Sequence, residues 1–120
     1  GLSNGLKLGN LDATRDWGHA KDYVKAMWEI LQLETSDDFV CSTGISHSVQ
    51  DLCEYVFGKL ELDWKLYVTQ DEKFLRPEEL HNLKGDSSKL VKATGWSHDY
   101  TFETMLDEMI EHWLTYYKQQ

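Results

Sequence analysis

LGNLDATRDWGHAKDYVKAM, from Leu8 to Met27, carries the chain from a strand through a polar turn into a helix. Residues 6–8 predict the short strand. From Ala20 onward, apolar residues recur every three or four positions, which predicts an amphipathic helix. Arg15 and Asp16 occupy the turn between them, so this stretch already indicates a fold that mixes strands and helices.

Three later stretches also show helical spacing. Apolar residues over 49–60 follow Ser48, a capping residue with an acid three positions further on. A short helix after Asp86 is expected to stop at Gly95. Residues 102–117 keep the three-and-four pattern without a break, which predicts one long helix.

Short extended stretches alternate with these helices. They are predicted at residues 6–8, 38–42 and 64–68, and more weakly at 80–84. The alternation predicts an α/β fold with a small sheet and about four helices, in one domain over residues 1–120. Trp28 and Trp113 share helix faces with other apolar residues, which indicates core packing for both.

The net charge of −9 restricts the partners that the chain is expected to bind. Nucleic acids and anionic membranes are held by clustered Lys and Arg, so neither is expected. No segment has the apolar length of a membrane span and no signal region opens the chain, so a cytoplasmic location is expected. The histidines and cysteines show no zinc spacing, so no metal site is expected, and Cys41 and Cys53 are predicted to be buried free thiols.

The chain has ten lysines but only two arginines, Arg15 and Arg76. Pro77 biases Arg76 away from helical geometry, so both arginines are expected in loops that border regular structure. Arginine presents a planar fork of donors that can hold a phosphate or a carboxylate at two points. The two positions therefore indicate an anion site or, alternatively, two ion pairs with neighbouring acids.

A resemblance to a known family rests on four motifs: LGNLDATRDWGHAKDYVKAMW, DDFVCSTGISHSVQDL, FLRPEELHNLKGD and ATGW. Together they resemble the C-terminal third of the GDP-mannose 4,6-dehydratases, which are extended short-chain dehydrogenase/reductases. The resemblance runs from about Leu6 to the final helix. It implies that residues 1–120 are the C-terminal nucleotide-sugar-binding portion of a Rossmann enzyme whose N-terminal cofactor-binding domain is absent from this chain.

The resemblance implies binding roles for five residues and catalytic roles for none. Arg15 and Arg76 would hold the pyrophosphate of the nucleotide sugar. Glu79 would accept a hydrogen bond from the ribose. Leu8 and Asn10, at the end of the LGN strand, would contact the edges of the guanine base.

The resemblance also implies a reaction, a cofactor and partners. The whole enzyme would be a homo-oligomeric lyase that converts GDP-mannose to GDP-4-keto-6-deoxymannose with NADP, in the synthesis of deoxysugar nucleotides such as GDP-fucose. The family's G-x-x-G-x-x-G fingerprint and its catalytic residues are not in these 120 residues, so this chain alone is expected to be inactive. Two alternatives remain: part of a 4-keto-sugar reductase or nucleotide-sugar epimerase, and a free-standing, non-catalytic nucleotide-sugar-binding or interaction domain.

Three further patterns are interpreted as structural. Tyr55 and Lys59 have the Tyr-x-x-x-Lys spacing but lie in the second predicted helix, far from the family's position for that pair, so we interpret the spacing as coincidence. His19 is expected to order the turn or the helix start. Residues 46–48, Ser-His-Ser, lack an orienting acid and are expected to form a helix-entry turn.

Overall fold

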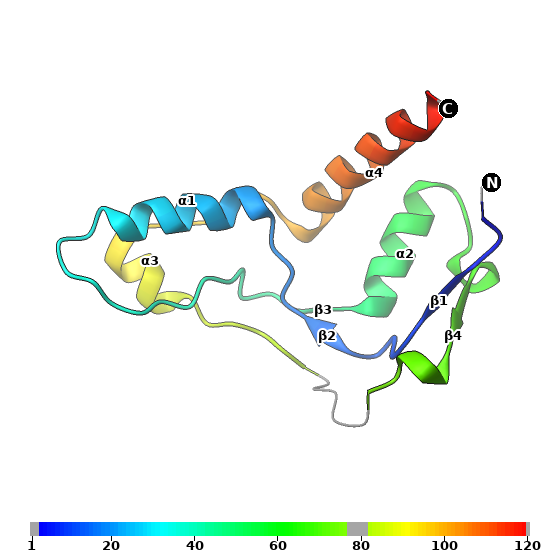
Figure 1. The fold of residues 1–120 in the computed structure, drawn as a ribbon, viewed down its shortest axis with the longest axis horizontal. Helices are drawn as coiled ribbons and strands as arrows, with labels where there is room; N and C mark the ends of the chain where they lie inside the picture. Colours follow the sequence, from blue (N-terminus) through cyan, green and yellow to red (C-terminus); the bar gives the residue numbers. More distant parts are fainter. Residues whose placement is uncertain (1–2, 77–81, 120) are drawn as a thin grey trace. The chain divides into compact units, whose positions relative to one another are not determined.

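The computed structural model describes residues 3–76 and 82–119 and forms two compact units. Unit 1 comprises Gly1–Arg15 and Ser46–Leu83, and unit 2 comprises Asp16–Ile45 and Lys84–Gln120. The chain passes from one unit to the other three times, as the colours of Figure 1 allow the reader to follow. Both units are therefore assembled from segments that lie far apart in the sequence.

Unit 1 is built on two short pairs of strands. β1 (Leu6–Leu8) pairs in parallel with β4 (Val68–Gln70), and β2 (Thr14–Arg15) pairs antiparallel with β3 (His47–Ser48). The helical elements of this unit are α2 (Val49–Lys59) and two 3₁₀ turns, η1 (Trp64–Leu66) and η2 (Glu72–Phe74).

The core of unit 1 joins the strands to α2. Leu11, Cys53 and Val68 are buried there. Partly buried apolar side chains pack around them: Leu8, Val49, Phe57 and Trp64. Burial of these groups from water stabilises strands that, at two or three residues each, are too short to be stable by themselves.

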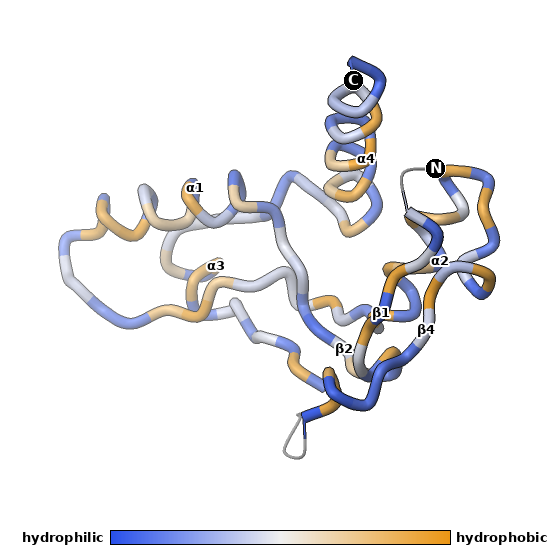
Figure 2. The backbone as a smooth tube through the Cα atoms, turned by 45° about the vertical axis from the view of Figure 1, so that its right-hand side comes forward, coloured by the Kyte–Doolittle hydropathy of each residue, from blue (hydrophilic) through white to orange (hydrophobic). Residues whose placement is uncertain are grey.

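Unit 2 is helical and consists of α1 (Ala20–Leu31), α3 (Ser88–Thr94) and α4 (Phe102–Lys118). Ala26 of α1, Leu90 of α3 and Trp96 are its buried core. Ile30, Phe39 and Cys41 pack against that core. Hydrophobic and hydrophilic positions alternate along α1 and α4, as expected for helices with one apolar face (Figure 2).

Asp22 is a buried carboxylate that fastens the connection between α3 and α4 to α1. Its oxygens accept hydrogen bonds from the backbone N–H groups of Asp99 (2.8 Å) and Tyr100 (3.1 Å). Its backbone carbonyl accepts a hydrogen bond from Nε1 of Trp96 at 2.9 Å. A buried charge is tolerated in a protein interior only when it is paired in this way.

The mixed α/β class and all four helices agree with the sequence predictions. The capping box at Ser48 and Asp51 forms, and α3 ends at Gly95 in the left-handed conformation, with φ of 75°. No helix of the described residues is long and apolar enough to cross a membrane.

The extended stretches were predicted less well. β1 is confirmed, but residues 38–42 form no strand, and of residues 64–68 only Val68 is in a strand, since Trp64–Leu66 form η1. Within residues 80–84, Asn82 makes a single parallel bridge to Thr14, while residues 80 and 81 lie outside the described ranges.

The prediction that Trp28 and Trp113 pack in the core is wrong for this chain. Trp28 is 63% exposed and Trp113 is 48% exposed, whereas Trp96 is buried. Trp28 lies on the face of α1 opposite to Ala26, and Ala26 is the residue that contacts α3 and Trp96. Helical spacing identifies an apolar face but not which surface covers it.

Candidate functional site

Of the five residues predicted to bind a nucleotide sugar, the four that the structure describes lie in unit 1. Leu8, Asn10 and Arg15 lie on the single segment that runs from β1 to β2, and Arg76 follows η2. Glu79 lies outside the described residues. The geometry of the site is therefore described for the segment from β1 to β2 and for the described residues before and after Arg76.

Arg15 is half-buried on β2, directly opposite His47 of β3, so the prediction that it lies in a loop is wrong. Its Nη1 donates a hydrogen bond to the backbone carbonyl of Thr14 at 2.7 Å. This bond uses one donor of the guanidinium and directs the group along its own strand. A guanidinium carries five N–H donors in a planar fork, which is chemically suited to an anion.

Arg76 is exposed, and the segment that precedes it is hydrogen-bonded to the end of β1. The backbone N–H of Asp71 donates to the Leu8 carbonyl at 2.9 Å, and Nε2 of Gln70 donates to the Gly9 carbonyl at 3.3 Å. η2 follows at once and Arg76 comes two residues after it. Arg76 therefore follows closely after a segment that is hydrogen-bonded to the end of the LGN strand.

The chain that follows Arg76 returns to the strand that carries Arg15. The backbone N–H of Leu83 donates to the Thr14 carbonyl at 3.1 Å, and Oγ1 of Thr14 donates to Oδ1 of Asn82 at 2.7 Å. Arg15 is adjacent to Thr14 in β2. Hydrogen bonds before and after Arg76 therefore connect its segment to residues 6–15, which include Leu8 and Arg15.

The roles predicted for Leu8 and Asn10 stay predictions, although their surroundings are now defined. Leu8 is half-buried against the core of unit 1. Oδ1 of Asn10 accepts a hydrogen bond from the backbone N–H of Asp12 at 2.9 Å, which makes an Asx turn. Contact of Asn10 with a base would therefore have to be compatible with this turn, through its amide N–H₂ or the second lone pair of Oδ1.

Asp16, which the sequence analysis did not single out, organises the loops of unit 2 that adjoin the chain crossings. Its carboxylate accepts hydrogen bonds from the N–H (3.1 Å) and Oγ1 (2.5 Å) of Thr43 and from the N–H groups of Gly44 (2.8 Å) and Gly85 (3.4 Å). Desolvation acts to raise the pKa of Asp16, but these hydrogen bonds outweigh it and hold the pKa below its ordinary value.

His19 orders the start of α1, as predicted. Its Nδ1 accepts a hydrogen bond from the backbone N–H of Lys21 at 3.0 Å, so the imidazole is the N-cap of the helix. Its Nε2 lies 3.1 Å from Oε1 of Glu108, and its ring stacks on Tyr100 with 4.0 Å between ring centroids. A neutral ring with its proton on Nε2 satisfies both contacts.

The remaining reactive groups of the described residues show no catalytic arrangement. Lys59 lies over the ring of Tyr55, as neighbours four apart on α2 do, at 5.5 Å from the centroid. Both cysteines are free, and burial raises the pKa of the half-buried Cys41 and of the buried Cys53. No group of metal-binding side chains occurs among the described residues.

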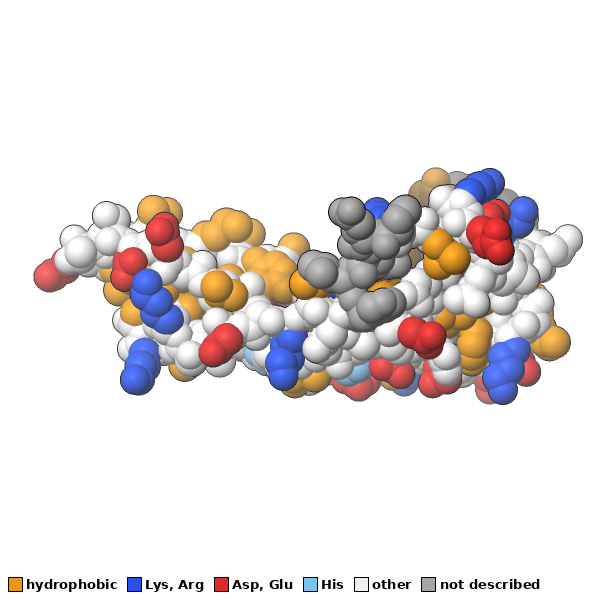
Figure 3. All heavy atoms as spheres, turned by 90° about the horizontal axis from the view of Figure 1, so that it is seen from below, with side chains coloured by type: hydrophobic (Ala, Val, Ile, Leu, Met, Phe, Trp, Pro, Cys, Tyr) orange, Lys and Arg blue, Asp and Glu red, His pale blue; other side chains and the backbone are white. Residues whose placement is uncertain are grey.

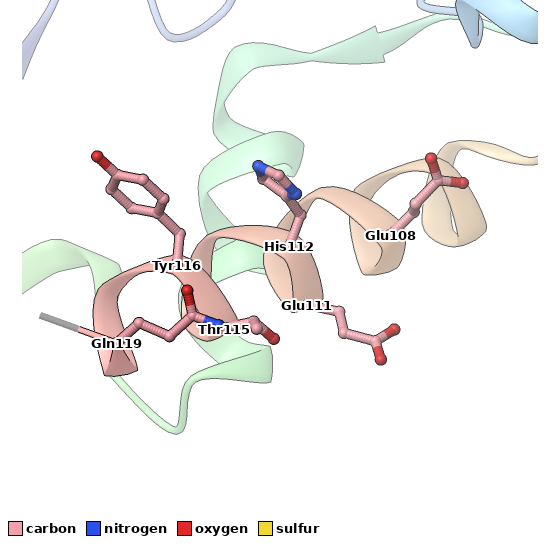
Figure 4. Close-up of a pocket in the computed structure, with 6 residues that line it drawn as sticks. All are labelled: Glu108, Glu111, His112, Thr115, Tyr116 and Gln119. Atoms are coloured by element: carbon pink, nitrogen blue, oxygen red, sulfur yellow. The ribbon is translucent and has the colours of Figure 1, made fainter.

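A shallow surface depression lies along α4 (Figure 4). All of its lining residues come from that one helix and its C-cap, Gln119: Glu108, Glu111, His112, Thr115, Tyr116 and Gln119. Helix side chains that line a depression without a second element facing them cannot enclose a ligand, so we assign no site there.

Comparisons with known proteins agree with the motifs. The family model for GDP-mannose 4,6 dehydratase matches residues 1–109. The chain belongs to the GDP-mannose 4,6 dehydratase family. It is 44% identical over 120 residues to GDP-mannose 4,6 dehydratase 2 of Arabidopsis thaliana, in an alignment that covers all of this chain and 32% of that relative. It is 40% identical over 122 residues to the human enzyme of the same name, which covers 88% of this chain and 33% of the relative.

Solved structures show the same fold at low sequence identity. RMD from Pseudomonas aeruginosa, complexed with NADPH, has a TM-score of 0.83 at 23% identity, over 95% of this chain and 37% of that one. The dTDP-glucose 4,6-dehydratase from Bacillus anthracis, in complex with NAD, has a TM-score of 0.82 at 18% identity, over 93% and 35%. The chain thus spans about a third of the length of these relatives and of these structures.

Proposed function

We propose that this chain is the C-terminal, substrate-binding portion of a GDP-mannose 4,6-dehydratase, a lyase that converts GDP-mannose to GDP-4-keto-6-deoxymannose. The observation that carries the proposal is the anchoring of the Arg76 segment at two points of the chain that leads to Arg15. Before Arg76 the segment is bonded to Leu8 and Gly9 at the end of β1, and after Arg76 it is bonded to Thr14 of β2, the strand that holds Arg15. An arginine on each of two linked segments suits a diphosphate, because each guanidinium can hold one phosphate group in two places.

In this proposal the chain orients the substrate and carries out no proton or hydride transfer. Arg15 and Arg76 bind the diphosphate, Glu79 binds the ribose, and Leu8 and Asn10 lie at the base. NADP supplies the hydride chemistry of the whole enzyme, but the glycine fingerprint that would bind it is not in these 120 residues, so no residue here is assigned to NADP. NADP belongs to the N-terminal cofactor-binding domain, and the chain alone is inactive.

The test is the affinity of the full-length enzyme for GDP-mannose after substitution of each arginine. Arg15→Ala and Arg76→Ala should each weaken binding by roughly 10- to 100-fold, because a hydrogen-bonded pair of opposite charges is lost. Isothermal titration calorimetry measures the dissociation constant directly. Lys65→Ala is the matched control, since it removes an exposed positive charge from the same unit and should leave the affinity unchanged.

Affinities equal to that of the unsubstituted enzyme in both arginine variants would refute the diphosphate clamp. A loss in the Lys65→Ala variant as large as in the arginine variants would instead indicate a nonspecific effect of charge, which is also contrary to the proposal.

A further inference from the structure

Gly9 lies at the end of β1, where the backbone of η2 comes so close that no side chain would fit. A Cβ atom at Gly9 would lie 2.6 Å from the carbonyl oxygen of Phe74, 3.1 Å from its carbonyl carbon and 3.3 Å from its Cβ. The φ angle of Gly9 is not in the left-handed region, which among the described glycines only Gly44 and Gly95 adopt. Gly9 is therefore required by space and not by backbone conformation.

The contact between Gly9 and Phe74 is part of a rigid path that ends at Arg76. The backbone N–H of Phe74 donates to Asp71 at 3.0 Å, and that of Leu75 donates to Glu72 at 3.0 Å, so both residues are fixed to η2. Asp71 is itself bonded to Leu8, as described above. Arg76 is joined directly to Leu75, which means that a displacement of Phe74 is passed to Arg76 over two residues.

We propose that Gly9 is a positioning residue for the diphosphate site. Because Gly9 has no side chain, the Phe74 backbone can pack directly against the end of β1, and this contact sets the position of Arg76. The inference rests on the proposed function and deepens it. The fork of arginine binds a phosphate only when both donors reach their oxygens, so the effect of Gly9 on binding is exerted through Arg76.

The first experiment replaces Gly9 by alanine in the full-length enzyme. The Phe74 carbonyl must then retreat from 2.6 Å to the 3.4 Å at which ordinary contact begins. We expect the KM for GDP-mannose to rise by about 10-fold or more while kcat changes little, because the lost interaction is substrate binding. Gly58→Ala is the matched control: its Cβ would meet nothing within 4 Å, and KM should be unchanged.

A double-variant cycle separates positioning from a general loss of structure. In an Arg76→Ala enzyme there is no guanidinium to misplace, so adding Gly9→Ala should raise KM by less than twofold, the signature of two residues that act through one interaction. If the two effects multiply, or if Gly9→Ala leaves KM unchanged while Arg76→Ala raises it, the positioning role is wrong. If Arg76→Ala itself has no effect, the proposed diphosphate site is wrong.

A second variant keeps the inference testable if Gly9→Ala does not fold. Gln70→Leu removes the 3.3 Å hydrogen bond to the Gly9 carbonyl and adds no atom that collides with it. Its expected effect is an increase in KM of up to about fivefold, again absent in the Arg76→Ala background. An equal increase with and without Arg76 would overturn the proposal.

Discussion

Asp16 and Arg15 are neighbours in sequence but have different partners. Arg15 stands on β2 of unit 1, while the Asp16 carboxylate binds donors of unit 2. The local alternative for Arg15, an ion pair with Asp16, therefore competes with four hydrogen bonds that Asp16 already accepts from Thr43, Gly44 and Gly85. This makes Asp16 the residue whose charge most directly stabilises the loops of unit 2.

Replacement of Asp16 by asparagine should lower the free energy of unfolding at pH 7 by about 1–3 kcal/mol. The amide keeps one acceptor oxygen, but its N–H₂ group would face donors that the carboxylate now satisfies. Thermal or urea unfolding followed by circular dichroism measures the difference. Asp38→Asn, which removes an exposed charge from the same unit, is the matched control and should change the free energy of unfolding by less than about 0.5 kcal/mol.

The same variant should also change the dependence of stability on pH. The folded-state pKa of Asp16 lies below its unfolded value, so its stabilisation is present above about pH 4 and is lost as the pH falls through the folded-state pKa. The difference between the unsubstituted and Asp16→Asn chains should therefore shrink below about pH 4. Asp37, Asp86 and Glu108, whose pKa values are also lowered, titrate in both chains and cancel in this difference. A difference that stays constant from neutral to acid pH would contradict the assignment.

Sequence reasoning selected Arg15 by its rarity and by motif, yet had no local signal for Asp16. The donor at Gly85 is 69 residues away in the chain, so no spacing rule connects the two. Gly9 was equally hidden, because a glycine near the end of a strand reveals its reason only when the backbone of Phe74 is placed beside it.

At the end of α3, Gly95 sets the direction in which the chain continues. Gly95 adopts φ of 75° and its N–H donates to the Val91 carbonyl at 2.7 Å, which closes the helix. Trp96 follows immediately and is buried in the core of unit 2. The left-handed residue therefore turns the chain so that the indole enters the core.

Gly95→Ala should lower the free energy of unfolding by about 1–2 kcal/mol, and Gly95→Asn should cost less, since asparagine tolerates the left-handed region. A Cβ at Gly95 would meet nothing within 4 Å, so the cost would come from backbone conformation alone. Gly58→Ala in α2 offers a control of opposite sign, with an expected gain of up to about 1 kcal/mol. Equal effects of alanine and asparagine at Gly95, measured by urea unfolding, would contradict this explanation.

Helices and their caps were predictable because their signals lie within a few residues, as at Ser48 and Gly95. Strands other than β1 were predicted poorly, because a strand exists only with a partner. Residues 38–42 have the composition of a strand, but within the described residues they pair with none. Trp64–Leu66 instead close a 3₁₀ turn whose N-cap is Asp63.

At the scale of the whole molecule, motifs identified more of the candidate site than periodicity did. Periodicity placed Arg15 and Arg76 beside regular elements, whereas the resemblance to a family suggested that they share a ligand. The physical link between them is nonlocal, since it depends on pairings such as Thr14 with Asn82, 68 residues apart. Neither approach indicated which apolar faces the chain itself covers.

One such face is the stripe on α1 formed by Val24, Met27, Trp28 and Leu31. These four positions share one side of the helix and all are exposed, whereas Asp22 and Ala26 on the other side are buried. Hydrophobic side chains reach the surface of the part that contains α1 and α3 (Figure 3). The relatives are about three times as long as this chain, so we propose that further chain, outside these 120 residues, covers the stripe in the full-length protein.

The isolated chain should accordingly associate through this stripe in a concentration-dependent way, whereas the full-length protein, whatever its own oligomeric state, should not associate through the stripe. Analytical ultracentrifugation of the two proteins, together with binding of a hydrophobic dye, measures this. Leu31→Lys should weaken the association of the isolated chain, since a charge is placed in an apolar contact. Leu66→Lys is the matched control: Leu66 is 76% exposed, against 80% for Leu31, but it lies on η1 of unit 1, outside the stripe. A chain that stays monomeric at high concentration, or one in which both lysine variants act equally, would show that the stripe on α1 is not a docking surface.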